Sequence, residues 1–535
     1  MITILKNAKI YVDKGNFQES ILIDNGIIKE IGTNEYISKF GADKEIDLCG
    51  KTVLPGLNDS HMHLLATGEA MSLCDLTQCR SIDEIIETSK RFLTNNTNPN
   101  IIVGRGWNQD NFAAGEKRIL NRLDLDKVST DIPIIFKRIC EHVATVNSKA
   151  LKMLNIDEST FVDGGEIIIG SDGKPNGILT ENAISLTDAI IPTKTDADRE
   201  KEFLKAAEYA VSVGLTSVQS NDVINGNHRD IFRILHNIYD NKKTKLKYDT
   251  QFNFQNINYF NEYLETEFKT GTYDGKFLSK GALKLFKDGS LGGRTALMLN
   301  DYHDEPGIKG VAALSDDQLE EMCYAATSHN IRVITHAIGD GAIESVIKAY
   351  EKTIDKRNKN NSLRHGIVHC QITNKNQLKR IAELNISVMY QPIFLDCDTK
   401  IVEQRIGKEL ASTSYAFNTL NKLCVPISFG TDSPVENCNP FPNIYCAVTR
   451  QRLDGTPIGG YVPAERLSVE DAIDIYTAGS AYNEFKESIK GRLYKGYAAD
   501  LVVLNTDIFT IDHNEIKNIK VDLTMIDGEI VFERK

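Results

Sequence analysis

Eight short apolar segments rich in β-branched residues recur along the chain, and most are separated by segments with helical spacing. They predict strands over residues 52–63, 214–220, 245–254, 281–290, 331–340, 364–371, 386–392 and 425–434. Amphipathic segments at 316–330, 341–354 and 374–385 predict helices between them. Alternating strand and helix signals indicate βα units around a parallel sheet. Eight such units predict the α/β class and a (β/α)₈, TIM-like barrel.

Two regions fall outside this barrel. Residues 1–52 and 490–535 alternate apolar and polar positions and carry Asn-Gly or Asp-Gly pairs typical of hairpin turns. We expect the two ends to form one small β-sandwich, since half a sandwich would leave an apolar face bare. The barrel then takes residues 53–75 and 206–489. Residues 76–205 separate the first two strands by far more than an ordinary crossover, so we expect an inserted subdomain that covers the barrel mouth.

Composition narrows the class of protein and its partners. The 535 residues are 41% hydrophobic and 25% charged, as in ordinary globular proteins, and the formal net charge is -12. That charge argues against nucleic-acid or anionic-membrane partners, whose phosphates require concentrated Lys and Arg. We expect no secretory signal at the start and no membrane span, because no run of about 18 apolar residues occurs. The expected partner is a small-molecule substrate, and a homo-oligomer is compatible with the sequence.

The ten cysteines are scattered and contain no Cys-x-x-Cys pair. A disulfide framework belongs to short secreted chains, so these residues indicate reduced thiols. We therefore expect a cytoplasmic protein.

Residue types that bind metals fall repeatedly at the ends of the predicted strands. His61 and His63 stand two residues apart at the end of the first strand, where residues two apart share one face. This spacing also arises by chance in an exposed strand, but later strands add Lys284, His336, His369 and Asp432. The active site of a (β/α)₈ barrel lies at the C-terminal ends of its strands. Imidazole and carboxylate ligands suit a divalent metal, zinc first, so we expect one or two ions there.

Lys284 has two interpretations. A deprotonated lysine can react with carbon dioxide to form a carbamate, whose two oxygens can bridge two metal ions. Alternatively, Lys284 pairs with Asp288 at the end of the strand. Lys287 competes for the first role, and period-two alternation allows only one of these two lysines to face the site.

Asp432 is the candidate general base and acid. Its carboxylate could take a proton from a metal-activated water and pass that proton to a leaving nitrogen. The alternative is a helix N-cap, because Asp followed by Ser-Pro is also a common helix start.

These residues and their surroundings resemble the amidohydrolase superfamily, and within it the amidohydrolase-3 branch of YtcJ-like proteins, which includes N-substituted formamide deformylases. The similarity covers PGLNDSHMH, KLFKDGSLGGRTALM, THAIGD, RHGIVHCQ, FGTDSPVENCNPF and, in the insertion, GRGWNQDNF. The resemblance implies a metal centre at His61, His63, Lys284, His336, His369 and Asp432, with Lys284 as the carboxylated bridge. The family's sixth strand often reads Arg-x-x-Glu-His, whereas Val368 precedes His369 here. An acidic partner of that histidine is therefore missing or supplied from elsewhere.

Four further residues are candidates for substrate binding. Arg294 follows the fourth strand and could bind a substrate carboxylate or an oxyanion, with a surface ion pair as the alternative. Trp107, His142 and Glu181 belong to the insertion and could line a pocket under a lid. Trp107 is the single tryptophan, and the core of the subdomain is its alternative place.

The function that fits these features is a metal-dependent hydrolase acting on a carbon–nitrogen bond other than a peptide bond, in a substituted amide or formamide. One rival is a mononuclear deaminase on the same barrel. It would require His-x-x-Glu on the fifth strand, where the sequence offers Asp340 four residues after His336, and it would leave Lys284 without a role. The other rival is a metal-free scaffold or binding protein. The presence of all six proposed ligands argues against it.

Overall fold

The computed structural model describes residues 1–95, 99–113, 117–138, 142–224, 227–254, 256–269, 275–354 and 361–535. The chain divides into two compact units. One consists of Met1–Ala66 with Ala206–Lys535, and the other is Thr67–Lys205. The first unit therefore joins two stretches of sequence that the second one separates.

The centre of the first unit is a sheet of eight parallel strands, nearly closed into a barrel. In chain order, which is also their order in the sheet, they are β8 (Leu57–Met62), β15 (Leu215–Ile224), β16 (Lys247–Asn253), β17 (Leu278–Phe286), β18 (Val333–Ala337), β19 (Gly366–His369), β20 (Ser387–Tyr390) and β21 (Ile427–Phe429). The predicted α/β class and TIM-like barrel are confirmed. Ala282, Ile334, Val368 and Met389, from four successive strands, pack together in one buried cluster.

The prediction of a single strand over residues 52–63 is wrong in one respect, because this segment forms two strands. β7 (Thr52–Pro55) pairs with strands from the two chain ends, and only β8 belongs to the barrel. Gly56 separates them, and a Cβ at this position would lie 2.2 Å from Oγ1 of Thr216. The apolar run is therefore divided between two sheets at Gly56, where the segment that contains Thr216 approaches closely.

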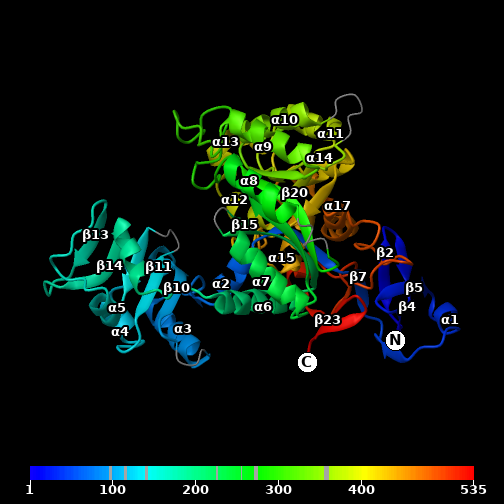
Figure 1. The fold of residues 1–535 in the computed structure, drawn as a ribbon, viewed down its shortest axis with the longest axis horizontal. Helices are drawn as coiled ribbons and strands as arrows, with labels where there is room; N and C mark the ends of the chain where they lie inside the picture. Colours follow the sequence, from blue (N-terminus) through cyan, green and yellow to red (C-terminus); the bar gives the residue numbers. More distant parts are fainter. Residues whose placement is uncertain are drawn as a thin grey trace. The chain divides into compact units, whose positions relative to one another are not determined.

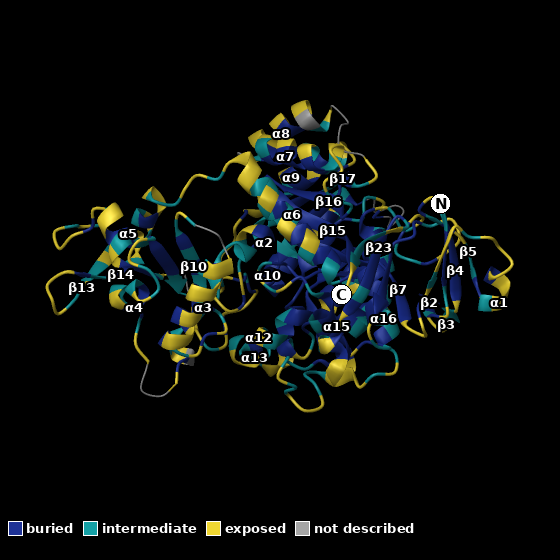
Figure 2. Cartoon of the chain, turned by 90° about the horizontal axis from the view of Figure 1, so that it is seen from below, coloured by how far each residue is buried: buried dark blue, intermediate teal, exposed yellow. Residues whose placement is uncertain are grey.

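Helices cover the outside of the barrel. The three predicted helices are confirmed as α9 (Asp316–Ser328), α10 (Asp340–Thr353) and α11 (Lys375–Glu383). α9 and α11 each begin with a capping box, in which the N-cap residue and a Gln three residues later satisfy each other's main-chain N–H groups. Figure 2 shows the strands β15 to β17 as buried, whereas α7 (His228–Asp240) and α8 (Ile257–Tyr263) carry exposed residues.

Contacts between β8 and the segment after β21 bring the two ends of the barrel sheet together. The main-chain nitrogen of Asp432 donates to the oxygen of His61 at 2.8 Å, and that of His63 donates to the oxygen of Ser433 at 2.7 Å. A Cβ on Gly430 would lie 2.6 Å from the nitrogen of His61. A side chain at position 430 would therefore separate the two segments that carry the candidate ligands.

Both ends of the chain build a small β-sandwich (Figure 1). One sheet has the order β5 (Ile27–Gly32), β4 (Ser20–Asp24), β1 (Ile2–Lys6), β6 (Lys44–Asp47). The other has the order β24 (Glu529–Glu533), β23 (Val521–Ile526), β22 (Leu501–Leu504), β7, β2 (Lys9–Asp13), β3 (Asn16–Gln18). Apolar residues of both sheets share one core, including Leu5, Ile23, Val503 and Met525. The predicted sandwich is confirmed.

Two hairpins of the sandwich turn at the expected dipeptides. φ is positive at Asn25 (48°) and Gly26 (81°), and again at Asp527 (47°) and Gly528 (73°). Positive φ at both central residues is the requirement of a type I′ turn, which matches the twist of the strands that it joins.

The second unit has its own sheet and cores. Its six strands lie in the order β13 (Gly165–Ile169), β14 (Pro175–Glu181), β12 (Val143–Val146), β11 (Ile134–Arg138), β10 (Ile102–Trp107), β9 (Cys74–Asp75). The unit also contains α3 (Ile82–Asn95), α4 (Arg122–Asp126) and α5 (Ser148–Met153). Two apolar clusters fill it, one that includes Trp107 and Phe136 and one that includes Ile135 and Leu179. The unit can therefore bury apolar surface by itself.

The length and polarity of the helices and the state of the cysteines bear on two expectations from the sequence. Every helix within the described ranges is too short or too polar to cross a membrane. Nine cysteines in these ranges are free thiols, and Cys140 lies outside the described residues.

Candidate metal centre

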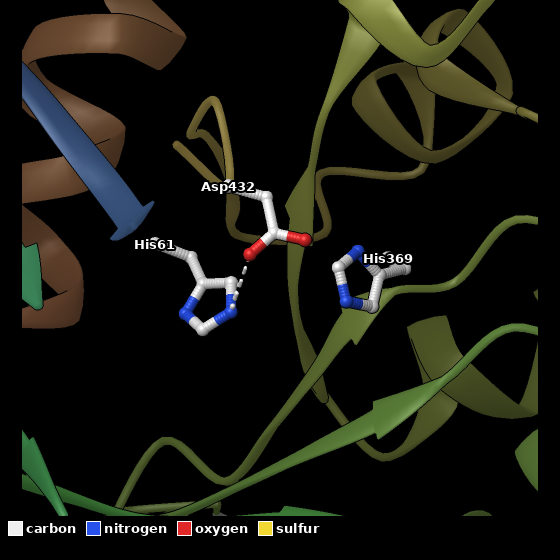
Figure 3. A group of neighbouring side chains, drawn as sticks. All are labelled: His61, His369 and Asp432. Carbon is white, nitrogen blue, oxygen red and sulfur yellow. Dashed lines mark ion pairs between the residues drawn. The ribbon is translucent and has the colours of Figure 1, made fainter. Parts of the chain in front are cut away.

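Three side chains at one end of the barrel form a group that could hold a metal ion. They are His61, His369 and Asp432, and their ligand atoms all lie within 4.8 Å of one another. All three side chains are buried. Figure 3 shows the carboxylate of Asp432 between the two imidazoles. The group thus combines two neutral nitrogen donors with one anionic oxygen donor, a set suited to a divalent cation.

The other three predicted ligands surround this group. Nε2 of His63 lies 3.3 Å from Oδ1 of Asp432, which also lies 3.4 Å from Nε2 of His61. The ring of His336 lies 4.4 Å from that of His369, centroid to centroid. Lys284 is fully buried, and its charge acts on His61, His63 and His369. The fold therefore brings all six predicted residues together.

Glutamine side chains orient two of the histidines. Nδ1 of His61 lies 2.6 Å from Oε1 of Gln251, and Nδ1 of His369 lies 2.7 Å from Oε1 of Gln391. A carboxamide oxygen only accepts hydrogen bonds, so Nδ1 of each histidine carries the proton and Nε2 keeps its lone pair. The family's acidic partner of His369 is thus replaced by a neutral amide, which comes from the end of the next strand, β20.

Main-chain carbonyl groups orient the other two histidines. Nδ1 of His63 lies 2.8 Å from the oxygen of Asn221, and Nε2 of His336 lies 3.0 Å from the oxygen of Gly289. By the same reasoning, His336 directs Nδ1 away from its carbonyl partner, and Nε2 of His63 faces Asp432. Each of the four histidines therefore has one nitrogen held by an acceptor outside the group of candidate ligands, as metal-binding histidines usually do.

Left-handed backbone conformations place two of the ligands. φ is 76° at His369 and 57° at Asp432, a region that residues other than glycine seldom adopt. Val368 packs in the barrel core, so regular alternation would turn His369 outward. The left-handed residue at the end of β19 ends this alternation and directs the imidazole towards Asp432. Strained residues of this kind persist only where the surrounding structure holds them.

The charges within the group suit cation binding. Burial, together with the charge of Lys284, holds the pKa of His61 well below its usual range. Burial opposes ionisation of Asp432, but the hydrogen bond with His63 and the neighbouring imidazoles of His61 and His369 hold the pKa of this carboxyl well below its usual range. At neutral pH the site therefore holds a neutral imidazole at His61 and a carboxylate at Asp432.

Lys284, rather than Lys287, faces this group. Among the described residues, Nζ of Lys284 has no hydrogen-bond partner, and it lies 3.6 Å from the ring centroid of Phe286. Burial lowers the pKa of Lys284 to about 7, although the charge of Asp432 opposes the shift. Lys287 instead donates to the oxygen of Leu314 at 2.6 Å and to Asp316 at 2.7 Å. Burial therefore favours the neutral amine of Lys284, the form that can react with carbon dioxide.

The alternative partner of Lys284, Asp288, is engaged elsewhere. Its carboxylate accepts hydrogen bonds from the main-chain nitrogens of Leu297, Ile338 and Gly339, at 2.8 to 3.0 Å. It lies 3.4 Å from Nε2 of His336. Asp288 therefore joins the loops after β17 and β18 and leaves Lys284 unpaired.

Asp59 is a functional residue that the sequence analysis missed. This buried carboxyl accepts hydrogen bonds from the main-chain nitrogen of His61 at 3.1 Å and from the hydroxyl of Thr431 at 2.6 Å. Burial raises the pKa of Asp59 to about 7, although the hydrogen bonds from Thr431 and His61 oppose the shift. In the sequence, its position two residues before His61 was the signal that could have identified Asp59. Asp59 positions the segments that carry His61 and Asp432.

Arg294 forms an ion pair with Asp304. Its guanidinium donates to Asp304 through Nε at 3.3 Å and through a terminal nitrogen at 2.9 Å. The hydrogen bond to Asp304 is the main reason that the pKa of Arg294 is raised. The ion pair that the sequence left as the alternative is therefore the observed arrangement.

The other three candidates for substrate binding, Trp107, His142 and Glu181, lie in the second unit. Trp107 takes its alternative place in the core of the second unit, where its indole is fully buried and its Nε1 donates to the oxygen of Phe136 at 3.2 Å. His142 and Glu181 are exposed and pair with each other at 2.9 Å. No further contact assigns this pair a function in the described part of the unit.

Comparisons with known proteins agree with this site. A model of the amidohydrolase family matches residues 44–532. "Putative amidohydrolase YtcJ" of Bacillus subtilis (strain 168) is 31% identical over 527 residues, which cover 98% of this chain and 97% of the relative. "N-substituted formamide deformylase" of Arthrobacter pascens is 26% identical over 557 residues, with 100% and 98% covered.

A solved structure extends the likeness to the fold. An uncharacterized metal-dependent hydrolase from Pyrococcus furiosus has a TM-score of 0.76 at 28% identity, over 95% of this chain and 100% of that one. Since the family model and the Bacillus relative both span nearly all of the sequence, this chain belongs to the amidohydrolase family.

Proposed function

We propose that this protein is a zinc-dependent hydrolase that cleaves a carbon–nitrogen bond other than a peptide bond, in a substituted amide or formamide. The observation that carries the proposal is the buried group of His61, His369 and Asp432, beside the unpartnered amine of Lys284. The Arthrobacter relative, named for the deformylation of N-substituted formamides, supports this choice of bond.

The proposed metal ligands are the six residues predicted from the sequence: His61, His63, Lys284, His336, His369 and Asp432. The four histidines suit a borderline cation such as zinc, because each has one ring nitrogen held by an acceptor outside the group of candidate ligands. A divalent cation bound there would supply Lewis-acid chemistry, polarising a carbonyl group and acidifying water.

In this proposal Lys284 is N-carboxylated. The lone pair of the neutral amine attacks the carbon of carbon dioxide, a new N–C bond forms, and one amine proton passes to water. The resulting carbamate carries one negative charge on two oxygens, so it can serve as a ligand where the ammonium could not. The burial of Lys284 and its lowered pKa support this step, because both favour the neutral amine.

Asp432 acts as general base and then as general acid. It is ionised at neutral pH, and its Oδ1 lies 3.3 Å from Nε2 of His63 and 3.4 Å from Nε2 of His61. The carboxylate takes a proton from the water that attacks the substrate carbonyl. It then passes this proton to the leaving nitrogen, so that the amine departs in neutral form.

Deamination is less well supported. Asp340, the acid available after β18, is the first residue of α10, and its carboxylate accepts a hydrogen bond from the nitrogen of Leu299 at 2.9 Å. It is thus engaged in a loop contact. Three expectations stay predictions: the cover that residues 76–205 form over the barrel mouth, the cytoplasmic location and the homo-oligomer.

The test combines metal content with hydrolysis. Purified wild-type protein, reconstituted with zinc and bicarbonate, is assayed on N-substituted formamides and amides beside Asp432→Asn and the exposed control Asp240→Asn. We expect near-stoichiometric zinc in the wild type, and activity reduced at least about 100-fold in Asp432→Asn but unchanged in Asp240→Asn. Release of ammonia from aminated heterocycles instead would favour the deaminase. Absence of bound zinc would overturn the metal centre and favour the scaffold.

A further inference from the structure

Two asparagines at the ends of neighbouring barrel strands are not used by the chemistry above. They are Asn221, near the end of β15, and Asn253, the last residue of β16. Their exposed fractions are 3% and 8%, and Oδ1 of each lacks a hydrogen-bond partner within the described residues. Buried carbonyl oxygens are nearly always paired, because an unpaired one loses its hydration without compensation. Two such oxygens on adjacent strands therefore indicate a donor that the chain itself does not supply.

The side chain of Asn253 faces the barrel interior. Gln251, two residues earlier, reaches His61 of the metal centre. Phe252 and Phe254 point the other way, and their rings lie 4.8 and 5.1 Å from that of Tyr263 in α8. Since side chains alternate along a strand, Asn253 shares the inward face with Gln251.

Asn253 also lies beside the metal centre. It is paired in register with Lys284 on β17, so the two side chains are neighbours on the same face of the sheet. The carboxamide of Asn253 thus lies on the wall that carries the proposed carbamate.

Asn221 belongs to the same wall. Its main-chain oxygen holds the ring of His63, which places this residue next to the centre. In the sheet, β15 and β16 lie between β8, which carries His61, and β17, which carries Lys284. Asn221 and Asn253 therefore lie on the two neighbouring strands that connect His61 to Lys284 in the sheet.

We propose that Oδ1 of Asn221 and Oδ1 of Asn253 share the N–H of the substrate amide as acceptors of one three-centre hydrogen bond. The inference rests on the proposed function and narrows it: the substrate is an amide whose nitrogen carries hydrogen, and its N-methylated counterpart is rejected. An N-methyl amide offers no donor, so it would leave both buried oxygens unpaired. Sites built to bond a substrate N–H discriminate strongly against analogues that lack it.

Paired substrates test this selectivity. Zinc-loaded, full-length wild type is assayed on N-cyclohexylformamide and N-cyclohexyl-N-methylformamide, and on the matching acetamides. The variants are Asn221→Leu, Asn253→Leu and Asn253→Asp, with Asn253→Ala in reserve if the leucine variant does not fold. Thr250→Val is the matched control. Thr250 also lies on β16, and its Oγ1 is buried and lacks a hydrogen-bond partner within the described residues, but this side chain lies on the opposite face of the strand.

We expect the wild type to favour the N–H amide about 10- to 100-fold in kcat/KM. Each leucine variant should bring this ratio close to one, chiefly through loss on the N–H amide, while its zinc content stays that of the wild type. Asn253→Asp retains an acceptor oxygen and should retain the preference, and Thr250→Val should leave it unchanged.

Two results would overturn this inference alone: equal rates on both members of each pair in the wild type, or an unchanged ratio in both leucine variants. Loss of zinc from Asn253→Leu would also overturn it, because Asn253 would then serve Lys284 rather than the substrate. If the zinc-loaded wild type hydrolyses none of these compounds, the proposed function fails first, and the inference fails with it.

Discussion

Thr431 donates two hydrogen bonds to Asp59, from its hydroxyl at 2.6 Å and from its main-chain nitrogen at 3.1 Å. This contact connects the first strand of the barrel to the segment after the last one. Asp59 lies two residues before His61, and Thr431 directly precedes Asp432. The pair therefore sets the position of two candidate ligands without itself contacting the proposed ion.

Removal of the Thr431 hydroxyl should weaken metal binding. We expect Thr431→Val to lower zinc affinity about 10-fold, because outer partners of metal ligands typically contribute 10- to 100-fold. Thr431→Ser keeps the hydroxyl and should bind zinc as the wild type does. Competition with a chromophoric chelator measures both affinities. Wild-type affinity in Thr431→Val would show that the main-chain contact alone positions Asp432.

Loss of the amide that orients His369 should have a comparable effect. In Gln391→Leu the ring of His369 loses its fixed acceptor, and we expect zinc affinity to fall about 10- to 100-fold. Gln318→Leu is the control, because Gln318 closes the capping box of α9 and has no contact with the six candidate ligands among the described residues. Calorimetric titration of the metal-free protein with zinc measures both variants. Equal affinities in the two would contradict the role assigned to Gln391.

Substitutions of Lys284, on β17, and of Lys287, directly after this strand, should have different effects. Lys284→Met removes the amine that can be carboxylated, so we expect zinc affinity to fall more than about 10-fold and its dependence on bicarbonate to disappear. Lys287→Met should keep zinc but lose about 1–3 kcal/mol of stability, because it leaves the carbonyl of Leu314 unpaired. Zinc content and thermal unfolding distinguish them, and the reverse pattern would assign the carbamate to Lys287.

Asp249, deep in the barrel, should make stability depend on pH. Burial, with the charge of Glu484, raises the pKa of Asp249 to about 7. In the unfolded chain this carboxyl loses its proton near pH 4, whereas in the folded protein it keeps the proton up to about pH 7. The folded state binds more protons in this window, so stability falls as pH rises from about 4 to 7.

The corresponding variant is Asp249→Asn, whose side-chain oxygen can still accept the hydrogen bond from Ser279. We expect it to be more stable than the wild type at pH 8, by at most about 4 kcal/mol, and to match it more closely at pH 5. Unfolding of metal-free protein at both pH values measures the difference, with the exposed Asp240→Asn as control. An equal gain at both pH values would show that ionisation of Asp249 is not the cause.

Much of the fold could be predicted because its signals are local. Apolar runs and amphipathic segments identified the barrel, and the Asn25-Gly26 and Asp527-Gly528 pairs identified hairpins of the terminal sandwich. The positions of His61, His63, Lys284, His336, His369 and Asp432 at strand ends predicted that these residues share one end of the barrel, and the structure brings them together. Their role as metal ligands stays a prediction that the experiments above address.

Other features depended on contacts between distant parts of the chain. His61 and Gln251 are separated by 190 residues, and Asp59 and Thr431 by 372. No periodicity connects such pairs, and the left-handed φ of His369 leaves no mark in the residue pattern. The choice of Lys284 over Lys287, and the ion pair that occupies Arg294, likewise required the folded chain.

The sequence by itself thus determined the class of fold, the terminal sandwich and the candidate ligands, because alternation and residue type act over a few positions. The tertiary structure alone decided which nitrogen of each histidine is held by an outside acceptor, which lysine faces the centre and which buried acceptors lack a partner within the described residues. These properties depend on closure of the barrel, which places groups hundreds of residues apart within hydrogen-bonding distance.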